Sequence, residues 1–175
     1  MGEVPATVMG CVHGVPARGA CPRVWVVREG GTPITTVKQI LDTKGYAVWS
    51  IHPQESVFAA IQQMAERGVG ALVVLEGDAL VGIISERDYA RKVILKGRSS
   101  HETAVREIMT PHVICARLDQ SIEECMTIVT ERRIRHLPVL DSGRLVGIIS
   151  IGDLVKTIIA EQQFIIEQLE HYING

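Results

Sequence analysis

The chain is poor in the features that mark membrane proteins and nucleic-acid-binding proteins. Aromatic residues make up 4% of its 175 residues, and no apolar run approaches the roughly 20 residues that a membrane-spanning helix needs. The formal net charge is −2 and the pI is about 6.3, so no basic excess attracts nucleic acid or anionic lipid. We therefore predict no membrane partner, and nucleic acid is an unfavoured one.

Cysteine and targeting signals are also scarce. The four cysteines form no close C-x-x-C pair, and Cys11, His13 and Cys21 lack the second ligand pair of a zinc site. We therefore predict no metal site and no disulfides, with Cys125 as a small core residue on the apolar face of a helix. The first 23 residues lack the cationic and apolar regions of a secretory signal, which favours a cytoplasmic protein.

Familiar catalytic signatures are missing too. The sequence contains no G-x-x-x-x-G-K-[ST] phosphate loop, no H-E-x-x-H metal motif and no G-x-S-x-G nucleophile turn. Ser85 and Ser150, which stand at equivalent places in the chain, have no histidine repeated beside them. We therefore predict that the protein is not an enzyme and uses no catalytic cofactor.

What the chain does contain is an internal repeat. Val81–Ser85 and Val146–Ser150 have the same sequence, and their alignment extends without a gap from Val48 to Ile94. A shorter match precedes it, in which Thr35–Leu41 resembles Thr103–Met109 at an offset that is larger by three residues. The first repeat therefore carries a three-residue insertion near Asp42 to Gly45, and duplication is the simplest explanation of both matches.

Each repeat predicts the order strand, helix, strand, strand, helix. Apolar residues at helical spacing follow Ser56 and Ser121, which are suitable N-cap residues. Gly77-Asp78 and Ser142-Gly143 supply turns between the paired strands. The expected strands are Ala47–Ile51, Ala71–Leu75 and Leu80–Ile84 in the first repeat, and His112–Ala116, Leu137–Leu140 and Leu145–Ile149 in the second.

These elements predict an α/β (α+β) fold in which two βαββα repeats pack face to face about a pseudo-two-fold axis. A short helix precedes the repeats and a long helix follows them. The expected division is a loose tail at 1–32, a first repeat at 33–97, a second at 98–160 and a helical extension at 161–175. The last helix carries a partial apolar stripe, which favours packing on a second subunit, with folding back on its own module as the alternative. The stripe consists of Leu154, Ile158, Ile165, Leu169 and Tyr172 or Ile173.

A Ser-x-x-Asp pattern closes the strand pair of each repeat. Ser85 and Asp88, and likewise Ser150 and Asp153, follow a buried strand and open a helix. Free backbone N–H groups and the helix dipole favour a phosphate there, and an Asp can accept hydrogen bonds from a ribose diol. The same pattern is also a capping box, so the residues alone leave both interpretations open.

A basic segment leads into the second strand pair. Arg135 and His136 precede Leu137 and Pro138, and arginine forks suit phosphate oxygens, although cations also complement the end of a helix. The first repeat has Gly68–Ala71 at this place, so its pocket should be less positive. Arg87, Arg91 and Lys44 are the cations expected to supply charge to that pocket instead.

Three segments are specific in combination: Leu80–Asp88, Arg135–Val139 followed by Leu145–Asp153, and Ile108–Pro111. Together they resemble the CBS-domain family, named for cystathionine β-synthase, over most of the chain. The resemblance implies a stand-alone tandem pair, or Bateman module, of the bacterial signal-transduction type. Such modules form homodimers and bind AMP, ADP, ATP, NAD or S-adenosylmethionine in two clefts between their repeats.

The resemblance also implies roles for individual residues. Asp88 and Asp153 would hold ribose hydroxyls, while Ser85 and Ser150 would contact ribose or phosphate. Strand starts would face the adenine, and other residues would line the pockets or add charge. These residues are Ala71, Leu72, Val73, His136, Leu137, Pro138, Thr110, Pro111, Arg87 and Arg135 and, more loosely, Lys44 and Tyr46.

We therefore predict a regulatory module that binds an adenine nucleotide at two sites per chain and signals its state to a partner protein. The arginines favour a phosphorylated ligand, with AMP as the first expectation and NAD or ATP as further ones. One alternative is a nucleotide-hydrolysing enzyme. Another is a single-stranded nucleic-acid-binding module built on Arg132, Arg133 and Arg135, against which the few aromatic residues argue.

Overall fold

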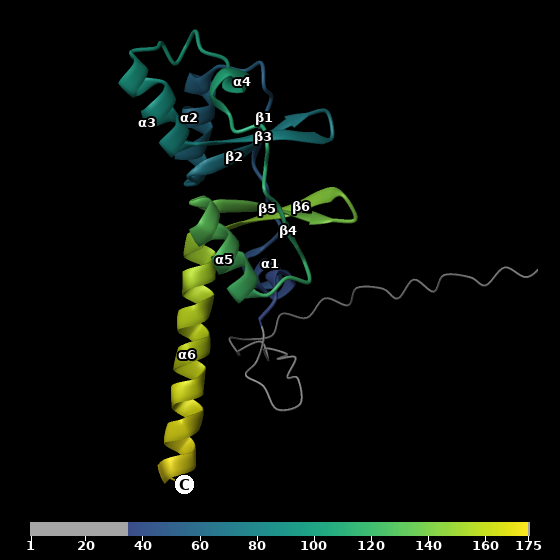
Figure 1. Ribbon diagram of the computed structural model, residues 1–175, viewed down its shortest axis with the longest axis vertical. Helices are drawn as coiled ribbons and strands as arrows, with labels where there is room; N and C mark the ends of the chain where they lie inside the picture. The colour runs from purple at the N-terminus through teal and green to yellow at the C-terminus, as the bar shows by residue number, and fades with distance from the viewer. Residues whose placement is uncertain (1–34, 175) are drawn as a thin grey trace, which may run out of the picture.

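The computed structural model describes residues 35–174, which form two similar units and a long projecting helix (Figure 1). The predicted order of strand, helix, strand, strand, helix is confirmed in both repeats. The first repeat contains α1 (Val37–Lys44), β1 (Ser50–Ile51), α2 (Val57–Arg67), β2 (Ala71–Glu76), β3 (Ala79–Ser85), α3 (Glu86–Lys92) and the 3₁₀ turn η1 (Ile94–Lys96). The second contains α4 (Val105–Ile108), β4 (Ala116–Arg117), α5 (Ile122–Arg132), β5 (His136–Asp141), β6 (Arg144–Ser150) and α6 (Ile151–Asn174).

Each repeat builds a three-stranded sheet with the same topology. β1 pairs parallel to β2, which pairs antiparallel to β3, and β4, β5 and β6 repeat this arrangement. Both hairpins also shift register at equivalent places, between Val74 and Leu75 and between Val139 and Leu140. The leading strands are shorter than the predicted Ala47–Ile51 and His112–Ala116. In the first repeat β1 is limited to Ser50–Ile51, and Ala47 and Trp49, which precede it, line a cleft.

The predicted N-caps begin the helices that cover the sheets. Ser56 Oγ accepts a hydrogen bond from Ala59 N at 3.2 Å, and Ser121 Oγ accepts one from Glu124 N at the same distance. These caps satisfy backbone donors that an uncapped helix start would leave without partners. The sequence therefore determines where α2 and α5 begin. These two helices in turn lead each repeat into its second strand.

The head helices α1 and α4 are exchanged between the repeats. Val37 and Leu41 of α1 are fully buried in the core of the second repeat, whereas Val105 and Ile108 of α4 are buried in the core of the first. Figure 1 shows the exchange directly, with α1 beside α5 and β4, and α4 beside the first sheet. The expected ranges 33–97 and 98–160 thus describe sequence repeats, while each packed core takes its head helix from the other range.

The exchange is held by equivalent main-chain hydrogen bonds. Val37 N donates to Gln120 O at 2.9 Å, and its counterpart Val105 N donates to Glu55 O at 2.8 Å. Further bonds repeat the same relation on both sides of the molecule. These paired contacts relate the two halves by an approximate two-fold axis, as the repeat predicts.

A glycine in each β-hairpin allows the exchanged segment to approach. A Cβ atom on Gly147 would lie 2.7 and 2.8 Å from the Leu41 methyl carbons, and a Cβ on Gly82 would lie 2.6 Å from Met109 Sδ. Leu41 and Met109 occupy corresponding positions in the two heads. The shared glycine of the repeat is therefore explained by close packing of each head against the other repeat's sheet.

The long helix α6 has one buried and one exposed apolar face. It runs without a break from Ile151, so the predicted boundary at residue 161 falls inside it. Leu154, which was expected in the exposed stripe, is fully buried in the second core, and Ile158 packs against that core. Leu169 and Ile173 of the predicted stripe are exposed, and with Val155, Ile159 and Ile166 they make the exposed apolar face. Within residues 35–174, no helix is long and apolar enough to cross a membrane.

Candidate functional site

A cleft of about 370 Å³ lies between the two repeats. Its volume falls within the range of small-molecule sites. One wall comes from the first repeat and the other from the second, while the end of α1 closes a third side. The lining residues are Lys44, Gly45, Ala47, Trp49, Gly68, Val69, Gly70, Ala71, His136, Ile148, Ser150 and Asp153.

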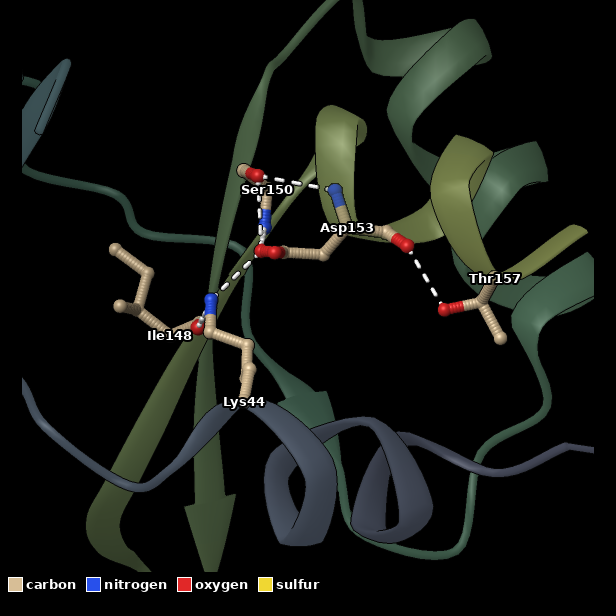
Figure 2. A network of polar contacts seen from close by, with 5 residues as sticks. All are labelled: Lys44, Ile148, Ser150, Asp153 and Thr157. Atoms are coloured by element: carbon tan, nitrogen blue, oxygen red, sulfur yellow. Dashed lines mark hydrogen bonds and ion pairs between the residues drawn. The ribbon is translucent and has the colours of Figure 1, made fainter. Parts of the chain in front are cut away.

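Asp153 is the most heavily hydrogen-bonded group of this cleft (Figure 2). Its Oδ2 accepts from Ser150 N at 2.7 Å, from Ser150 Oγ at 2.8 Å and from Lys44 Nζ at 2.7 Å. Lys44 Nζ also donates to Ile148 O at 2.9 Å. Asp153 Oδ1 accepts no hydrogen bond from the described residues, so one carboxylate oxygen is available to a ligand.

The Asp153 carboxyl is held in its charged form. Burial alone would raise the pKa of Asp153, but the hydrogen bonds from Lys44 and Ser150 and the charge of Lys44 keep it below its ordinary value. The group is therefore an anionic acceptor at neutral pH. Such an acceptor suits hydroxyl donors, as in a sugar diol.

The equivalent carboxyl of the first repeat has different partners. Asp88 Oδ2 accepts from Ser85 N at 3.1 Å and from Ser85 Oγ at 2.6 Å, which is the same capping arrangement. Asp88 Oδ1 pairs with Lys92 Nζ at 2.8 Å, one turn further along α3. Both Ser-x-x-Asp pairs are thus capping boxes, but the cation on Asp88 is local whereas that on Asp153 comes from the other repeat.

His136 lies at the start of β5 on the second-repeat wall of the cleft. Burial lowers the pKa of His136, and the nearby cations Lys44, Arg135 and Arg87 lower it further, although Asp153 opposes them. The imidazole is therefore neutral at neutral pH. A neutral ring can offer one nitrogen as donor and the other as acceptor to a ligand base.

The stability of the protein is expected to fall as the pH drops below 6.5, the ordinary pKa of histidine. In that range unfolded His136 takes up a proton while folded His136 resists it, so protons favour the unfolded state. Melting temperatures between about pH 8 and pH 5.5 measure the effect, and His136→Gln should flatten the curve. His112→Gln, at an exposed histidine, is the control, and an unchanged slope in His136→Gln would contradict this assignment.

Several predicted residues do meet in the cleft. Ser150, Asp153, His136, Ala71 and Lys44 all line it. Lys44 was expected to add charge to the pocket beside Gly68–Ala71, and it lines the same cleft as those residues. Because α1 packs on the second repeat, Lys44 reaches Asp153 instead of Asp88.

Other predicted residues lie elsewhere. Tyr46 does not line the cleft, and its hydroxyl donates to Asp42. Thr110 pairs through its backbone with Ile83, at N–O distances of 2.8 and 3.1 Å. Pro111 lines a separate hollow between the hairpins, whose other lining residues are Asp78, Leu80, Val113, Cys115, Leu140, Gly143 and Leu145.

The remaining predicted residues contribute backbone or charge rather than side-chain walls. The side chains of Leu72, Val73, Leu137 and Pro138 are buried, so only their main chain can face a ligand. Arg87 Nη1 donates to Arg133 O at 3.2 Å, which links the repeats. Arg135 is exposed, and its carbonyl oxygen accepts a hydrogen bond from Ile151 N at 2.9 Å.

Sequence reasoning missed the first repeat's wall. Trp49, Gly68, Val69 and Gly70 all line the cleft, and the Arg67 guanidinium lies 4.0 Å from the centre of the Trp49 ring. A Cβ on Gly70 would lie 3.5 Å from Glu86 Oε2 and 3.8 Å from the His136 ring. In the sequence, Gly68 and Gly70 indicate only that the pocket is less positive at this place. Small residues, however, also indicate that a neighbouring chain or a ligand approaches closely.

Within residues 35–174, no group of three or more His, Cys, Asp or Glu side chains could hold a metal ion. Cys11, His13 and Cys21 lie outside the described residues. Cys125 is fully buried in the second core, as expected, and burial together with Glu124 raises its pKa to about 11. Its thiol is therefore a packing group rather than a nucleophile.

The protein belongs to the CBS-domain family, since the CBS domain model matches residues 37–94 and 105–160. The chain is 36% identical over 159 residues to the mitochondrial CBS domain-containing protein CBSX3 of Arabidopsis thaliana, a match covering 85% of this chain and 77% of that protein. A signal-transduction protein with CBS domains from Burkholderia ambifaria has a similar structure. Its TM-score is 0.71 at 53% identity, over 73% of this chain and 96% of that one.

A further structural relative was solved with ligands. The CBS domain pair of protein MJ0100, in complex with 5-methylthioadenosine and S-adenosyl-L-methionine, has a TM-score of 0.66 and 27% identity. The match covers 74% of this chain and 99% of that one. Together these relatives support a ligand-binding regulatory module.

Proposed function

We propose that this protein is a cytoplasmic adenine-nucleotide sensor that signals its ligand state to a partner protein. The observation that carries the proposal is the position of Asp153, a charged acceptor in a cleft lined by both repeats. A ligand held there touches both sheets and the end of α1. It would therefore stabilise one packing of the repeats, which a partner could recognise.

The cleft offers a distinct place for each part of a nucleotide. Trp49, Val69 and Ala71 provide apolar surface for the base, beside the neutral ring of His136. Asp153 Oδ1 is open to ribose hydroxyls. The N-terminal turn of α6 and the Lys44 ammonium provide positive charge for a phosphate.

AMP is the proposed ligand, with NAD or ATP as larger candidates. The adenosine-like ligands of MJ0100 support the adenosine part. The cations Lys44 and Arg135 favour a phosphate over the sulfonium of S-adenosylmethionine, because like charges repel at short range. The sensor is proposed to bind without turnover, so assays for ATP or NAD hydrolysis by pure protein should give no product.

A rise in melting temperature with AMP is the expected result. Ligand at about 100 times its dissociation constant adds about 2.7 kcal/mol per site, which corresponds to about 5–11 °C for a chain of this size. Asp153→Ala should abolish the shift at its cleft, and Asp88→Ala should abolish a second, separate shift if both sites fill. Parallel melts with ADP, ATP, NAD, NADH and S-adenosylmethionine identify the preferred ligand.

The variants need a reference of their own, because each also removes the carboxylate half of a capping box. Every shift is therefore measured against the same variant without ligand, and Asp119→Ala, whose side chain is 75% exposed, serves as the control. If AMP binds but saturates at one per chain, the two-site expectation fails. If none of the compounds raises the melting temperature of the unmodified chain, the proposed function is wrong.

The proposal includes a homodimer formed through α6. The exposed residues Val155, Ile159, Ile166, Leu169 and Ile173, with Gln162 between them, follow one another at alternating intervals of four and three. This is the heptad spacing of a coiled-coil seam, and isoleucine fills each position of the a type with Leu169 at a d position. A second copy carries the same seam, so a two-fold axis along α6 would cover both.

A further inference from the structure

Lys44 stands at the point where the head helix of the first repeat reaches the cleft of the second. Its ammonium bridges Asp153 Oδ2 at 2.7 Å and Ile148 O at 2.9 Å (Figure 2). The Lys44 side chain is 31% exposed and that of Asp153 is 25% exposed, so the pair faces the open cleft rather than the core. A partly exposed ion pair of this kind is weak enough for a ligand to displace.

The three-residue insertion explains why such a cation reaches Asp153 and has no counterpart from α4 at Asp88. The head α1 spans eight residues, whereas its counterpart α4 spans four. In the first repeat Ile83 O, the equivalent of Ile148 O, accepts the Thr110 backbone N–H at 2.8 Å. The longer head therefore replaces a fixed, neutral main-chain donor with a charged group on a flexible side chain.

The cation that pairs with Asp88 is not equivalent to Lys44. Lys92 belongs to α3 and pairs with Asp88 one turn away, and it also donates to Ile108 O at 2.6 Å. It is tied to the helix that carries its partner. Lys44, by contrast, ends a helix that packs on the other repeat, and its four-carbon stem can swing within the cleft.

We propose that Lys44 determines which ligands the Asp153 cleft accepts, and this inference rests on the proposed nucleotide-binding function. The ammonium pairs with Asp153 Oδ2, the second of the two carboxylate oxygens that a ribose diol would use beside the open Oδ1. A ribose diol displaces it, and the freed cation then pairs with the ligand's phosphate. The cleft thereby selects phosphorylated adenosine compounds.

The selection follows from what each ligand offers the displaced ammonium. A neutral ligand such as adenosine or 5-methylthioadenosine takes Asp153 but leaves Lys44 without an anion. S-Adenosylmethionine brings its own positive charge close to the ammonium, which opposes binding. A phosphate forms a charge-assisted hydrogen bond with Lys44 and so compensates the lost ion pair.

The test compares four ligands on the full chain by isothermal titration calorimetry. All proteins carry Asp88→Ala, so that the Asp153 cleft is measured. The probes are AMP, adenosine, 5-methylthioadenosine and S-adenosylmethionine. Lys44→Met should lower the ratio of AMP affinity to adenosine affinity about tenfold or more, and should strengthen binding of S-adenosylmethionine. Lys38→Met, which removes the same charge from an exposed position of α1, should leave the ratio unchanged.

Each other outcome has a definite meaning. If Lys44→Met weakens all four ligands by the same factor, Lys44 only supports the structure and the inference is overturned. The inference also fails if the affinity ratio stays as in the parent chain. If the parent chain binds none of the four compounds, the proposed function fails first, and the selection by Lys44 fails with it.

Discussion

Gly147→Ala is expected to lower the free energy of unfolding by about 1–3 kcal/mol, which is several degrees in melting temperature. The new methyl group would lie 2.7 and 2.8 Å from the Leu41 methyl carbons, and Leu41 is fully buried, so it has no free space to move into. Alanine gains about 0.5–1 kcal/mol over glycine in a strand through lower chain entropy, which the clash exceeds. Urea or thermal unfolding measures the difference.

The exchange of head helices can be tested at the same contact, between Leu41 and Gly147. Leu41→Ala alone should lower the free energy of unfolding by about 2–5 kcal/mol. The double variant Leu41→Ala/Gly147→Ala should lose less than the sum of the two single losses, by about 1 kcal/mol or more. The smaller side chain makes room for the added methyl. Gly152→Ala is the control, because a Cβ there meets only Ser150 Oγ at an ordinary 3.5 Å. Additive costs would show that residue 41 does not pack on residue 147.

Ile166→Glu is expected to dissociate the proposed dimer. Ile166 is 47% exposed in the single chain, so the change should leave the fold intact. In a symmetric seam, however, the two glutamates would face each other and lose their hydration. The dimer dissociation constant should rise by at least about a hundredfold, which sedimentation velocity measures directly.

Gln168→Glu adds the same charge at an exposed position of α6 outside the seam and should leave the dimer unchanged. Circular dichroism checks that both variants remain folded. A dimer that survives Ile166→Glu would have to form through another surface. A parent chain that sediments as a monomer at high concentration would remove the dimer from the proposed function altogether.

Local sequence patterns predicted the elements because each depends on nearby residues. Ser56 and Ser121 start helices through their own side chains, and the turn at Ser142 and Gly143 uses positive φ angles of 49° and 80°. Both hairpins follow from paired β-branched runs. Because the two repeats have similar sequences, the elements predicted for one repeat are predicted for the other as well.

The partner of each head helix could not be predicted in the same way. Thr35–Leu41 and Thr103–Met109 have similar apolar patterns, so either would fit either sheet. The choice is made by distant packing, and the position of Lys44 depends on that choice. Gly82 and Gly147 could have indicated a close packing contact, because a shared glycine in a buried strand indicates a close neighbour. They do not indicate which segment that neighbour is.

The exchanged heads also constrain how such a chain could arise. A polypeptide with one repeat could use its head helix only to complete the core of another molecule. Two identical chains would therefore have to exchange their head helices. In that pair the two clefts would be the same by symmetry, and any insertion would appear in both. Joining the copies in one chain releases that restriction. The longer head that carries Lys44 can then alter one proposed site and leave the other unchanged, so that the two proposed sites could differ in the ligands they bind.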